Sequence, residues 1–340
     1  MQAFRNHIAH ILPRLDISAV YSLVATIIKH TGTTHQHTVF HETPMANIDL
    51  SLSMQLQAYS ADVVQAETIT PDMLDRNVYT GAMFYNVEGH AGLGRVLPSV
   101  YMAYGRRNDD LAAGITVPCS AYAAGHDLNG AAYDRPLDKE QMIPPIIQSR
   151  GMRRVRIRSK MKQFTVGLLT SGSDGKFPQV LACDLAGRLS DEIPLYMTVL
   201  PKFSYPGLPL TIEDRQKRGK LVGCMLRPLA GFFYLLHLDA LVYATAPEYY
   251  EPAGTFVIEA AAAGVPIVCE RRGMMADTIQ HGWNGLLFDN VTEAIEHVMR
   301  LKSDDKLRDQ LAANGQLWAS WYDVSVHLGR LKAIWRALGI

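Results

Sequence analysis

Short apolar runs alternate with helical segments through the second half of the chain, and this alternation restricts the fold more than any other feature. We predict strands over 164–169, 195–200, 221–224, 240–244 and 265–269, and helices over 177–188, 228–237, 254–263, 291–302 and 304–318. Strands this short and apolar are usually buried on both faces, and strands that alternate with helices form a parallel sheet. The pattern therefore predicts a doubly wound α/β domain that binds ligands beyond the carboxyl ends of its strands.

The first 150 residues are less regular but contain the same kinds of segment. Strands are predicted over 38–41, 61–65, 82–87 and 114–118. A helix is predicted between the glycine-rich stretch 88–95 and about Tyr104. Residues 4–15 and 17–30 are also predicted to be helical, and the first of these carries apolar residues at helical spacing: Phe4, Ile8, Ile11, Leu12 and Leu15. We expect this stripe to form core or a contact between subunits rather than a membrane anchor.

Length and charge fit a two-domain protein without a polyanionic partner. The chain has 340 residues, of which 48% are hydrophobic, enough for two cores. Basic and acidic residues are equal in number, which argues against nucleic acid as a partner. The four cysteines lack metal-ligand spacing and predict buried free thiols in a reducing compartment. No apolar run approaches the ~20 residues that span a bilayer, so we expect a cytoplasmic protein, either free or peripheral at a membrane.

Histidines give a weak metal hypothesis in the first half of the chain. His35 and His37 form a His-x-His pair, with His41 close behind. No third ligand is evident, and zinc sites use three or four protein ligands. We therefore expect no metal.

Residues 248–290 combine two glutamates with a helix start and two glycine-containing turns. Glu251 precedes the helix predicted over 254–263, and Glu259 lies inside it. The helix is rich in alanine and ends at Gly264. Its first N–H groups have no internal partner and, with the helix dipole, form an anion site. This arrangement suits a ligand that carries phosphates and hydroxyls together, although two exposed glutamates that only complement the helix charge remain the alternative.

The loop 170–178 is a second candidate ligand site. It follows a predicted strand, opens a helix, and contains Gly172 and Lys176. Glycines permit close backbone approach, and the lysine supplies a mobile cation. A flexible turn with a surface lysine is the alternative.

The stretch 248–290 resembles the donor-binding signature of retaining glycosyltransferases with the GT-B fold, family-4 type (glycosyl transferases group 1). The matching residues are Glu251, Glu259-Ala260, Gly264-Val265-Pro266, Gly273, Asp277 and Gly282-Trp283-Asn284-Gly285-Leu286-Leu287. Weaker resemblance extends over most of 150–335. The likeness implies an α/β fold of two Rossmann-like domains, whose parallel sheets face an interdomain cleft. Residues 1–150, completed by the terminal helix 324–340, would form the acceptor-side domain, and 151–323 the nucleotide-sugar domain.

The resemblance also implies roles for single residues. Glu251 would contact the transferred sugar, Glu259 the ribose hydroxyls, and Lys176 the diphosphate. Family members often place a histidine after the strand that corresponds to 82–87, and His90 is the nearest candidate here. Backbone contacts with the donor are expected at Gly167, Gly172, Gly254, Thr255 and Phe256.

Several positions depart from the family pattern. Leu168 stands where the family has an arginine that binds the diphosphate, and three residues are candidates to replace it: Arg227, Arg271 and Arg272. Gly-Phe-Gly after the first glutamate is replaced by Pro252-Ala253-Gly254, and a double glycine by Gly273-Met274. The helix predicted over 4–15 replaces the family's opening strand and Gly-Gly loop, which leaves acceptor binding unexplained.

The function implied is a retaining glycosyltransferase that moves a sugar from a nucleotide-diphosphate sugar to an acceptor hydroxyl, without a metal or other cofactor. The acceptor would be a saccharide, a lipid-linked molecule or a protein. Homo-oligomerisation through the N-terminal helices is a further expectation. A phosphorylase or hydrolase on the same fold is one alternative. A non-catalytic binding or scaffold subunit is another, supported by Leu168 and by the unusual N-terminal segment.

Overall fold

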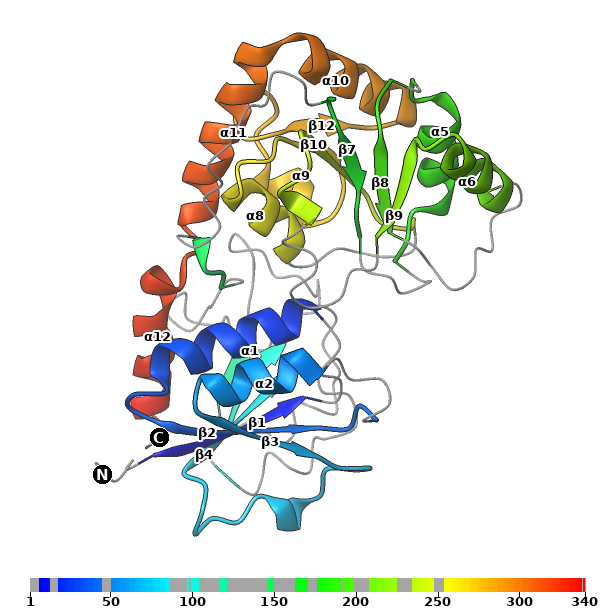
Figure 1. The fold of residues 1–340 in the computed structure, drawn as a ribbon. Helices are drawn as coiled ribbons and strands as arrows, with labels where there is room; N and C mark the ends of the chain where they lie inside the picture. Colours follow the sequence, from blue (N-terminus) through cyan, green and yellow to red (C-terminus); the bar gives the residue numbers. More distant parts are fainter. Residues whose placement is uncertain are drawn as a thin grey trace. The chain divides into compact units, whose positions relative to one another are not determined.

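The computed structural model consists of two compact α/β units (Figure 1). The first comprises Met1–Ile147 and Val324–Ile340, and the second comprises Gln148–Asp323. The structure describes residues 6–12, 18–44, 50–85, 97, 99–103, 117–120, 146–149, 163–170, 176–190, 192–198, 208–224, 234–247, 254–337 and 339. The predicted segments 88–95, 114–116 and 228–233 lie outside these residues.

A six-stranded parallel sheet forms the centre of the first unit, in the order β3-β2-β1-β4-β5-β6. Its strands are β1 (His7–Leu12), β2 (Gln36–His41), β3 (Ala61–Gln65), β4 (Gly81–Tyr85), β5 (Ser99–Ala103) and β6 (Val117–Ser120). Its helices are α1 (Ser18–Thr31), α2 (Leu50–Ala58), the 3₁₀ helix η2 (Pro71–Met73) and α12 (Val324–Ala337). The order of the sheet reverses between β1 and β4, because β2 and β3 extend it on one side and β5 and β6 on the other.

The main core of the first unit lies between the sheet and the helices α1, α2 and α12. In Figure 1, α1 and α2 cover one face of the sheet. Leu12 and Met83 of the sheet pack in one cluster with Ile27 of α1, Leu56 of α2 and Trp335 of α12. The last helix therefore packs with the first strands of the chain, although the whole second unit separates them in sequence.

Two predictions for the first unit are wrong. His7–Leu12, predicted as part of a helix, is the strand β1 in the interior of the sheet. Ile8, Ile11 and Leu12 are all buried, because an interior parallel strand is covered on both faces, and such a strand mimics helical spacing. Ser99–Ala103, also predicted as helix, is the strand β5 between β4 and β6. The helix predicted over 17–30 is confirmed as α1, as are the strands β2, β3 and β4.

The second unit contains another six-stranded parallel sheet, in the order β12-β11-β10-β7-β8-β9. Its strands are β7 (Val166–Leu168), β8 (Leu195–Thr198), β9 (Leu221–Cys224), β10 (Ala240–Tyr243), β11 (Ile267–Glu270) and β12 (Leu286–Phe288). Its helices are α5 (Gln179–Arg188), α6 (Leu208–Lys217), α8 (Thr255–Ala262), α9 (Met274–Thr278), α10 (Val291–Ser303) and α11 (Asp305–Ser320). The sequence predicted β7 to β11 and α5, α8, α10 and α11; it did not predict β12, α6 or α9.

Different sets of helices pack on the second sheet. Leu168 of β7 belongs to a buried cluster with Leu185 of α5 and Val298 of α10. The alanine-rich helix α8 packs against α11. A Cβ atom added to Gly315 of α11 would lie 3.5 Å from the Cβ of Ala261, which is ordinary contact distance. Small side chains on both helices thus allow α8 to lie close to α11.

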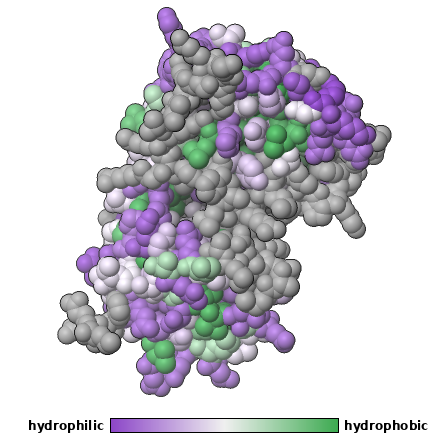
Figure 2. Space-filling model, in the orientation of Figure 1, coloured by the Kyte–Doolittle hydropathy of each residue, from purple (hydrophilic) through white to green (hydrophobic). Residues whose placement is uncertain are grey.

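The surface of the described residues is mostly hydrophilic in the view of Figure 2, with hydrophobic residues in small separate areas. Met54 and Leu317 are the most exposed of the large hydrophobic side chains. Among the helices that the structure describes, none is both long enough and apolar enough to cross a bilayer.

Candidate functional site

The second sheet reverses its order between two neighbouring strands, β7 and β10. From β7 the chain builds β8 and β9 on one side, and from β10 it builds β11 and β12 on the other. In open α/β sheets, ligands bind at the carboxyl ends of the two strands where the order reverses. The topology alone therefore places a candidate site after Leu168 of β7 and Tyr243 of β10. We refer to the described residues of this region, 169–170, 176, 244–247, 254–256 and 271–273, as the switch-point edge.

The loops after β7 and β10 are hydrogen-bonded to each other at this edge. The backbone N–H of Ala246 donates to the carbonyl oxygen of Lys176, with an N–O distance of 2.9 Å. The ammonium group of Lys176 lies 6.0 Å from the ring centroid of Tyr243, a cation–π distance, and the tyrosine side chain is buried. The predicted lysine thus lies at the end of β10, next to the place that the topology selects for a ligand.

Thr170 introduces a buried polar atom into the same edge. Its backbone N–H donates to the hydroxyl of Thr198 at the end of β8, and its carbonyl accepts from that hydroxyl. Its own Oγ1 is buried without a hydrogen-bond partner. Buried hydroxyls are rarely left unpaired, so this atom is a candidate to contact a ligand. The sequence analysis did not single out Thr170, and its only signal was its place directly after a buried strand.

The helix α8 begins at the switch-point edge without a side-chain cap. Gly254 is its N-cap residue, in a left-handed conformation at φ 54° and ψ 30°. The carbonyl of Gly254 accepts from the N–H groups of Val257 and Ile258. The N–H groups of Thr255 and Phe256 precede these first bonds and have no hydrogen-bond partner among the described residues. Two backbone donors at the positive end of a helix dipole suit an anion.

Two consecutive arginines end the neighbouring strand β11 and have different partners. The Nε of Arg271 lies 3.2 Å from Oδ1 of Asp289, in an exposed ion pair that links the ends of β11 and β12. The guanidinium of Arg272 donates instead to the loop after β10, through the carbonyl oxygens of Thr245 and Pro247, and to the carboxylate of Glu270. Neither arginine lies on β7, the strand that carries Leu168.

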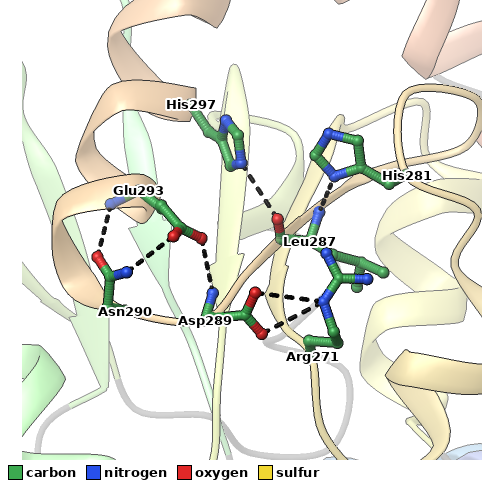
Figure 3. Close-up of polar contacts among 7 residues, drawn as sticks. All are labelled: Arg271, His281, Leu287, Asp289, Asn290, Glu293 and His297. Carbon is green, nitrogen blue, oxygen red and sulfur yellow. Dashed lines mark hydrogen bonds and ion pairs between the residues drawn. The ribbon is translucent and has the colours of Figure 1, made fainter.

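Figure 3 shows the hydrogen bonds that two histidines make with the backbone of the outer strand β12. The N–H of Leu287 donates to Nδ1 of His281 at 3.0 Å, and its carbonyl accepts from Nε2 of His297 at 3.1 Å. Burial lowers the pKa of His297, although its bond to the Leu287 carbonyl opposes this shift. Asn290 caps α10 by accepting from the N–H of Glu293 at 3.1 Å. Two histidines thus form hydrogen bonds with the outer side of β12, where no further strand pairs with its backbone groups.

The Asn-Gly-Leu-Leu part of the sequence signature has a structural explanation. The side chain of Asn284 is buried; its Oδ1 accepts from the N–H of Gln280 and its Nδ2 donates to the carbonyl of Thr278. A Cβ atom at Gly285 would lie 2.9 Å from the side chain of Ile279, closer than packing allows. The asparagine side chain therefore stabilises the turn before β12 by two hydrogen bonds. The glycine avoids a clash with Ile279 at the start of β12.

Of the two positions where the family pattern has a double glycine, only the first needs a glycine in this backbone. Gly273 has φ 60° and ψ −154°, a conformation that is essentially restricted to glycine. Met274 begins the helix α9 and is not at positive φ. The departure at Met274 therefore causes no backbone strain.

The structure describes six of the predicted site residues. Lys176, Gly254, Thr255 and Phe256 lie at the switch-point edge, and Glu259 lies about one turn inside α8. Gly167 lies within β7, where an added Cβ would come within 2.4 Å of the Leu238 side chain. Close packing thus explains this glycine, and its contact with a donor stays a prediction. Glu251, His90 and Gly172 lie outside the described residues, as does Arg227.

The His-x-His pair is engaged in hydrogen bonds. Both ring nitrogens of His37 are used, Nδ1 with His10 at 2.9 Å and Nε2 with Thr31 at 2.9 Å. His35 bonds to Thr34 and packs on the ring of Trp335, at 5.0 Å between centroids. Among the described residues, no group of three or more histidine, cysteine or acidic side chains is placed to hold a metal ion.

Part of the second unit matches a known protein family. Residues 234–318, which include the end of β10, α8, β11, β12 and most of α11, match the family model described as "Glycosyl transferases group 1". No curated protein matches the chain. The matched segment contains all of the switch-point edge that follows β10.

Solved structures resemble the whole chain in fold. HepE of Anabaena, crystallised with UDP and glucose, aligns with a TM-score of 0.71 at 14% identity, over 97% of this chain and 99% of HepE. A glycosyltransferase from Rickettsia africae aligns with a TM-score of 0.72 at 10% identity, over 98% of both chains. A sucrose-phosphate synthase from Thermosynechococcus elongatus aligns with a TM-score of 0.68 at 14% identity, over 98% of this chain and 99% of the synthase.

The fold is therefore that of the GT-B glycosyltransferases: two α/β units, each with a parallel sheet. In the second unit, residues 234–318 are similar to the glycosyl transferases group 1 family, and together the two findings support a transferase.

Proposed function

We propose that this chain is a glycosyltransferase that takes a sugar from a nucleotide-diphosphate donor and transfers it, with retention of anomeric configuration, to an acceptor hydroxyl. The carrying observation is the switch-point edge. Two backbone N–H groups at the start of α8 lie within a glycosyl transferases group 1 segment, and Lys176 lies at the adjoining strand end. Cationic and N–H donors gathered where a parallel sheet reverses its order suit the diphosphate of such a donor.

In the proposed reaction, the acceptor oxygen forms a bond to the anomeric carbon while the bond from that carbon to the diphosphate breaks. The diphosphate leaves with the bonding electrons and takes the acceptor's proton. Lys176 and the N–H groups of Thr255 and Phe256 would stabilise the charge that develops on it; losing one such donor typically costs about 3 kcal/mol of barrier. Glu251 would orient the sugar and Glu259 the ribose hydroxyls. We propose no resident metal, because these groups would neutralise the leaving group.

The donor can be sought among a small set of nucleotide sugars. HepE was crystallised with UDP and glucose, so UDP-glucose is a reasonable first donor for this chain. Release of nucleoside diphosphate should be measured with and without a panel of saccharide and lipid-linked acceptors, in the presence and absence of EDTA. Transfer should require an acceptor and should survive EDTA. Release without any acceptor would point to a hydrolase instead.

Glu251→Ala tests the proposed catalytic site. This variant should fold normally and lose transfer, because it removes the carboxylate that is proposed to orient the transferred sugar. Turnover close to that of the unmodified protein would show that Glu251 does not have this role.

A non-catalytic binding subunit is a second candidate. The identity and burial of Leu168 favour it. This residue occupies the place of the family's phosphate-binding arginine, and its side chain is fully buried in the core of the second unit. Calorimetry with nucleoside diphosphates separates the two candidates when it is paired with the transfer assay. Tight binding without transfer to any acceptor would favour the binding subunit.

A further inference from the structure

Arg272 links the end of β11 to the loop that follows β10. One terminal nitrogen, Nη1, donates to the carbonyl of Pro247 at 2.8 Å. The other, Nη2, donates to the carbonyl of Thr245 and to Oε2 of Glu270, the latter at 2.7 Å. The hydroxyl of Thr245 lies 3.3 Å from the same nitrogen. A single planar guanidinium thus holds two backbone carbonyls of one loop and a carboxylate of its own strand.

The same loop is held from its other side by the segment after β7. The N–H of Ala246, between the two carbonyls that Arg272 binds, donates to the carbonyl of Lys176 at 2.9 Å. Residues 245–247 therefore lie between Arg272 and Lys176, with hydrogen bonds to both. These bonds connect the strand ends of β7, β10 and β11, the three strands around the switch point.

Arg272 has little freedom to act as a simple phosphate cation. Its charge is balanced by Glu270, and its side chain is 28% exposed. Its Nε is buried without a hydrogen-bond partner. An arginine that leaves a buried N–H unpaired while both terminal nitrogens bond to the loop is oriented by the loop.

We propose that Arg272 is a positioning residue for the donor site. Arg272 fixes residues 245–247 against Lys176. These residues begin the connection from β10 to α8, which contains Glu251 in its sequence, so Arg272 fixes the point from which this connection starts. This inference rests on the proposed function, because it assumes that the switch-point edge binds a nucleotide-diphosphate donor. From the sequence, Arg272 is only a candidate cation for the diphosphate. In the structure its guanidinium instead holds the loop after β10 in place through two hydrogen bonds to backbone carbonyls.

Arg272→Gln and Arg272→Lys test the inference, with Arg218→Gln as the control. Arg218 lies just after α6, outside the switch-point edge, and makes an exposed ion pair with Asp214. The kinetic readouts are kcat and the KM for the nucleotide sugar, with the affinity for UDP, GDP and ADP from calorimetry. Both Arg272 variants should weaken the best-bound diphosphate about tenfold and raise the donor KM by a similar factor. The Arg218 variant should change neither by more than about twofold.

The lysine variant separates positioning from charge. An ammonium group keeps the charge but cannot reproduce the planar fork that binds two carbonyls and a carboxylate together. Arg272→Lys should therefore be as impaired as Arg272→Gln. Recovery of donor affinity in the lysine variant would show that the charge matters and would overturn the positioning role.

Hydrogen exchange at the amide of Ala246 supplies a readout that does not depend on activity. Arg272→Gln should speed exchange of this amide about tenfold relative to Arg218→Gln, because the loop is released from one of its two anchors. Unchanged exchange would refute the role of Arg272 in holding the loop, whatever the kinetics show.

If the unmodified protein neither binds a nucleoside diphosphate nor transfers a sugar, the proposed function fails and the donor role of Arg272 fails with it. In that case faster exchange would still show that Arg272 holds the loop.

Discussion

At the scale of single residues, Gly254 connects backbone conformation to ligand binding. Its left-handed backbone turns the chain into α8, where the N–H groups of Thr255 and Phe256 come first. An L-residue pays roughly 1–2 kcal/mol for the same conformation. A side chain here would shift the helix start as well as destabilise it.

Gly254→Ala should weaken nucleoside diphosphate binding about tenfold, because relaxation of the strained backbone would move the first N–H groups of α8. Isothermal titration of the variant against the unmodified protein measures this. Gly264→Ala is the matched control at the other end of the helix. Gly264 also has positive φ, at 75°, and a Cβ there would meet the side chain of Gln316. Equal losses of affinity in both variants would mean that helix stability, not the position of the amides, explains the effect.

The sequence indicated these positions to different degrees, for physical reasons, and their contact with a donor stays a prediction. Gly254, Thr255 and Lys176 were selected because glycines and a helix start leave clear local signals. Arg272 was selected only as one of three candidates, since the partners of an arginine depend on loops that are distant in sequence. Thr170 was included only as the first residue of the loop 170–178, because an unpaired hydroxyl has no sequence signature.

At the scale of elements, Arg215 holds together the helix α6, the end of α5 and the start of β9. Its side chain is 1% exposed and donates to backbone carbonyls at five positions: Ala186, Leu189, Ser190, Ile193 and Lys220. These carbonyls lie in and after α5 and just before β9. The carbonyls of Ser190 and Lys220 also accept from the N–H groups of Ile193 and Leu195. Arg215 therefore matters most for the carbonyls of Ala186, Leu189 and Ile193, since buried carbonyls are rarely left without a donor.

Arg215→Met should lower the free energy of unfolding by about 3 kcal/mol or more, because it leaves several buried carbonyls without donors. Urea denaturation followed by circular dichroism measures the loss. Arg218→Met is the control on the same stretch of chain, since Arg218 pairs with Asp214 in an exposed salt bridge. That variant should stay within about 0.5 kcal/mol of the unmodified protein. A loss at Arg215 no larger than at Arg218 would contradict the account.

Elements were predictable from the sequence where one face is polar, or where an apolar run is short and bounded by turns. The helices α10 and α11 and the strand β10 are of these kinds. The strand β1 was misread because His7–Leu12 is buried almost throughout, so its apolar residues do not alternate. Its one buried polar residue, His10, bonds to Tyr85 of β4 and His37 of β2, and partners this far away in sequence cannot be read locally.

This correction removes one departure from the glycosyltransferase pattern. The chain does have a strand near its beginning, as the resemblance implies, and the segment after that strand lies outside the described residues. Of the apolar stripe, Ile8, Ile11 and Leu12 are fully buried core, and Phe4 and Leu15 lie outside the described residues. Homo-oligomerisation through the N-terminal segments stays a prediction.

At the scale of the whole molecule, a buried histidine pair couples stability to pH. The hydroxyl of Thr31 donates to the carbonyl of Ile27, so it must accept from Nε2 of His37. Nδ1 of His37 then accepts from His10, whose other nitrogen accepts from the hydroxyl of Tyr85. Every position in this chain of bonds is filled when both histidines are neutral.

Burial lowers the pKa of both rings. The pKa of His10 falls well below its ordinary value, through burial and then the neighbouring His37 and His7. Burial lowers the pKa of His37 to about 3, helped by His35 and His7. The folded state therefore keeps both rings neutral under conditions where the unfolded chain, with ordinary pKa values near 6.5, binds protons.

Stability should thus be complete above pH 6.5 and fall as the pH drops below it. Between pH 6.5 and 5.5 each histidine should cost about 1 kcal/mol, or about 2 kcal/mol for the pair. Urea denaturation at pH 7.5, 6.5 and 5.5 measures this, and His37→Asn should reduce the loss of stability over this range by about 1 kcal/mol. Equal stability at pH 7.5 and 5.5 would contradict this explanation of the buried pair.

The most direct test of the account follows the backbone N–H groups of Thr255 and Phe256. Hydrogen exchange at the start of α8 should be measured with saturating UDP, GDP or ADP and with the matching nucleosides, which lack the diphosphate. The account predicts that at least one diphosphate slows exchange at these two amides about tenfold, and that no nucleoside does. A diphosphate that binds while exchange at Thr255 and Phe256 stays the same would contradict the claim that this helix start holds the donor.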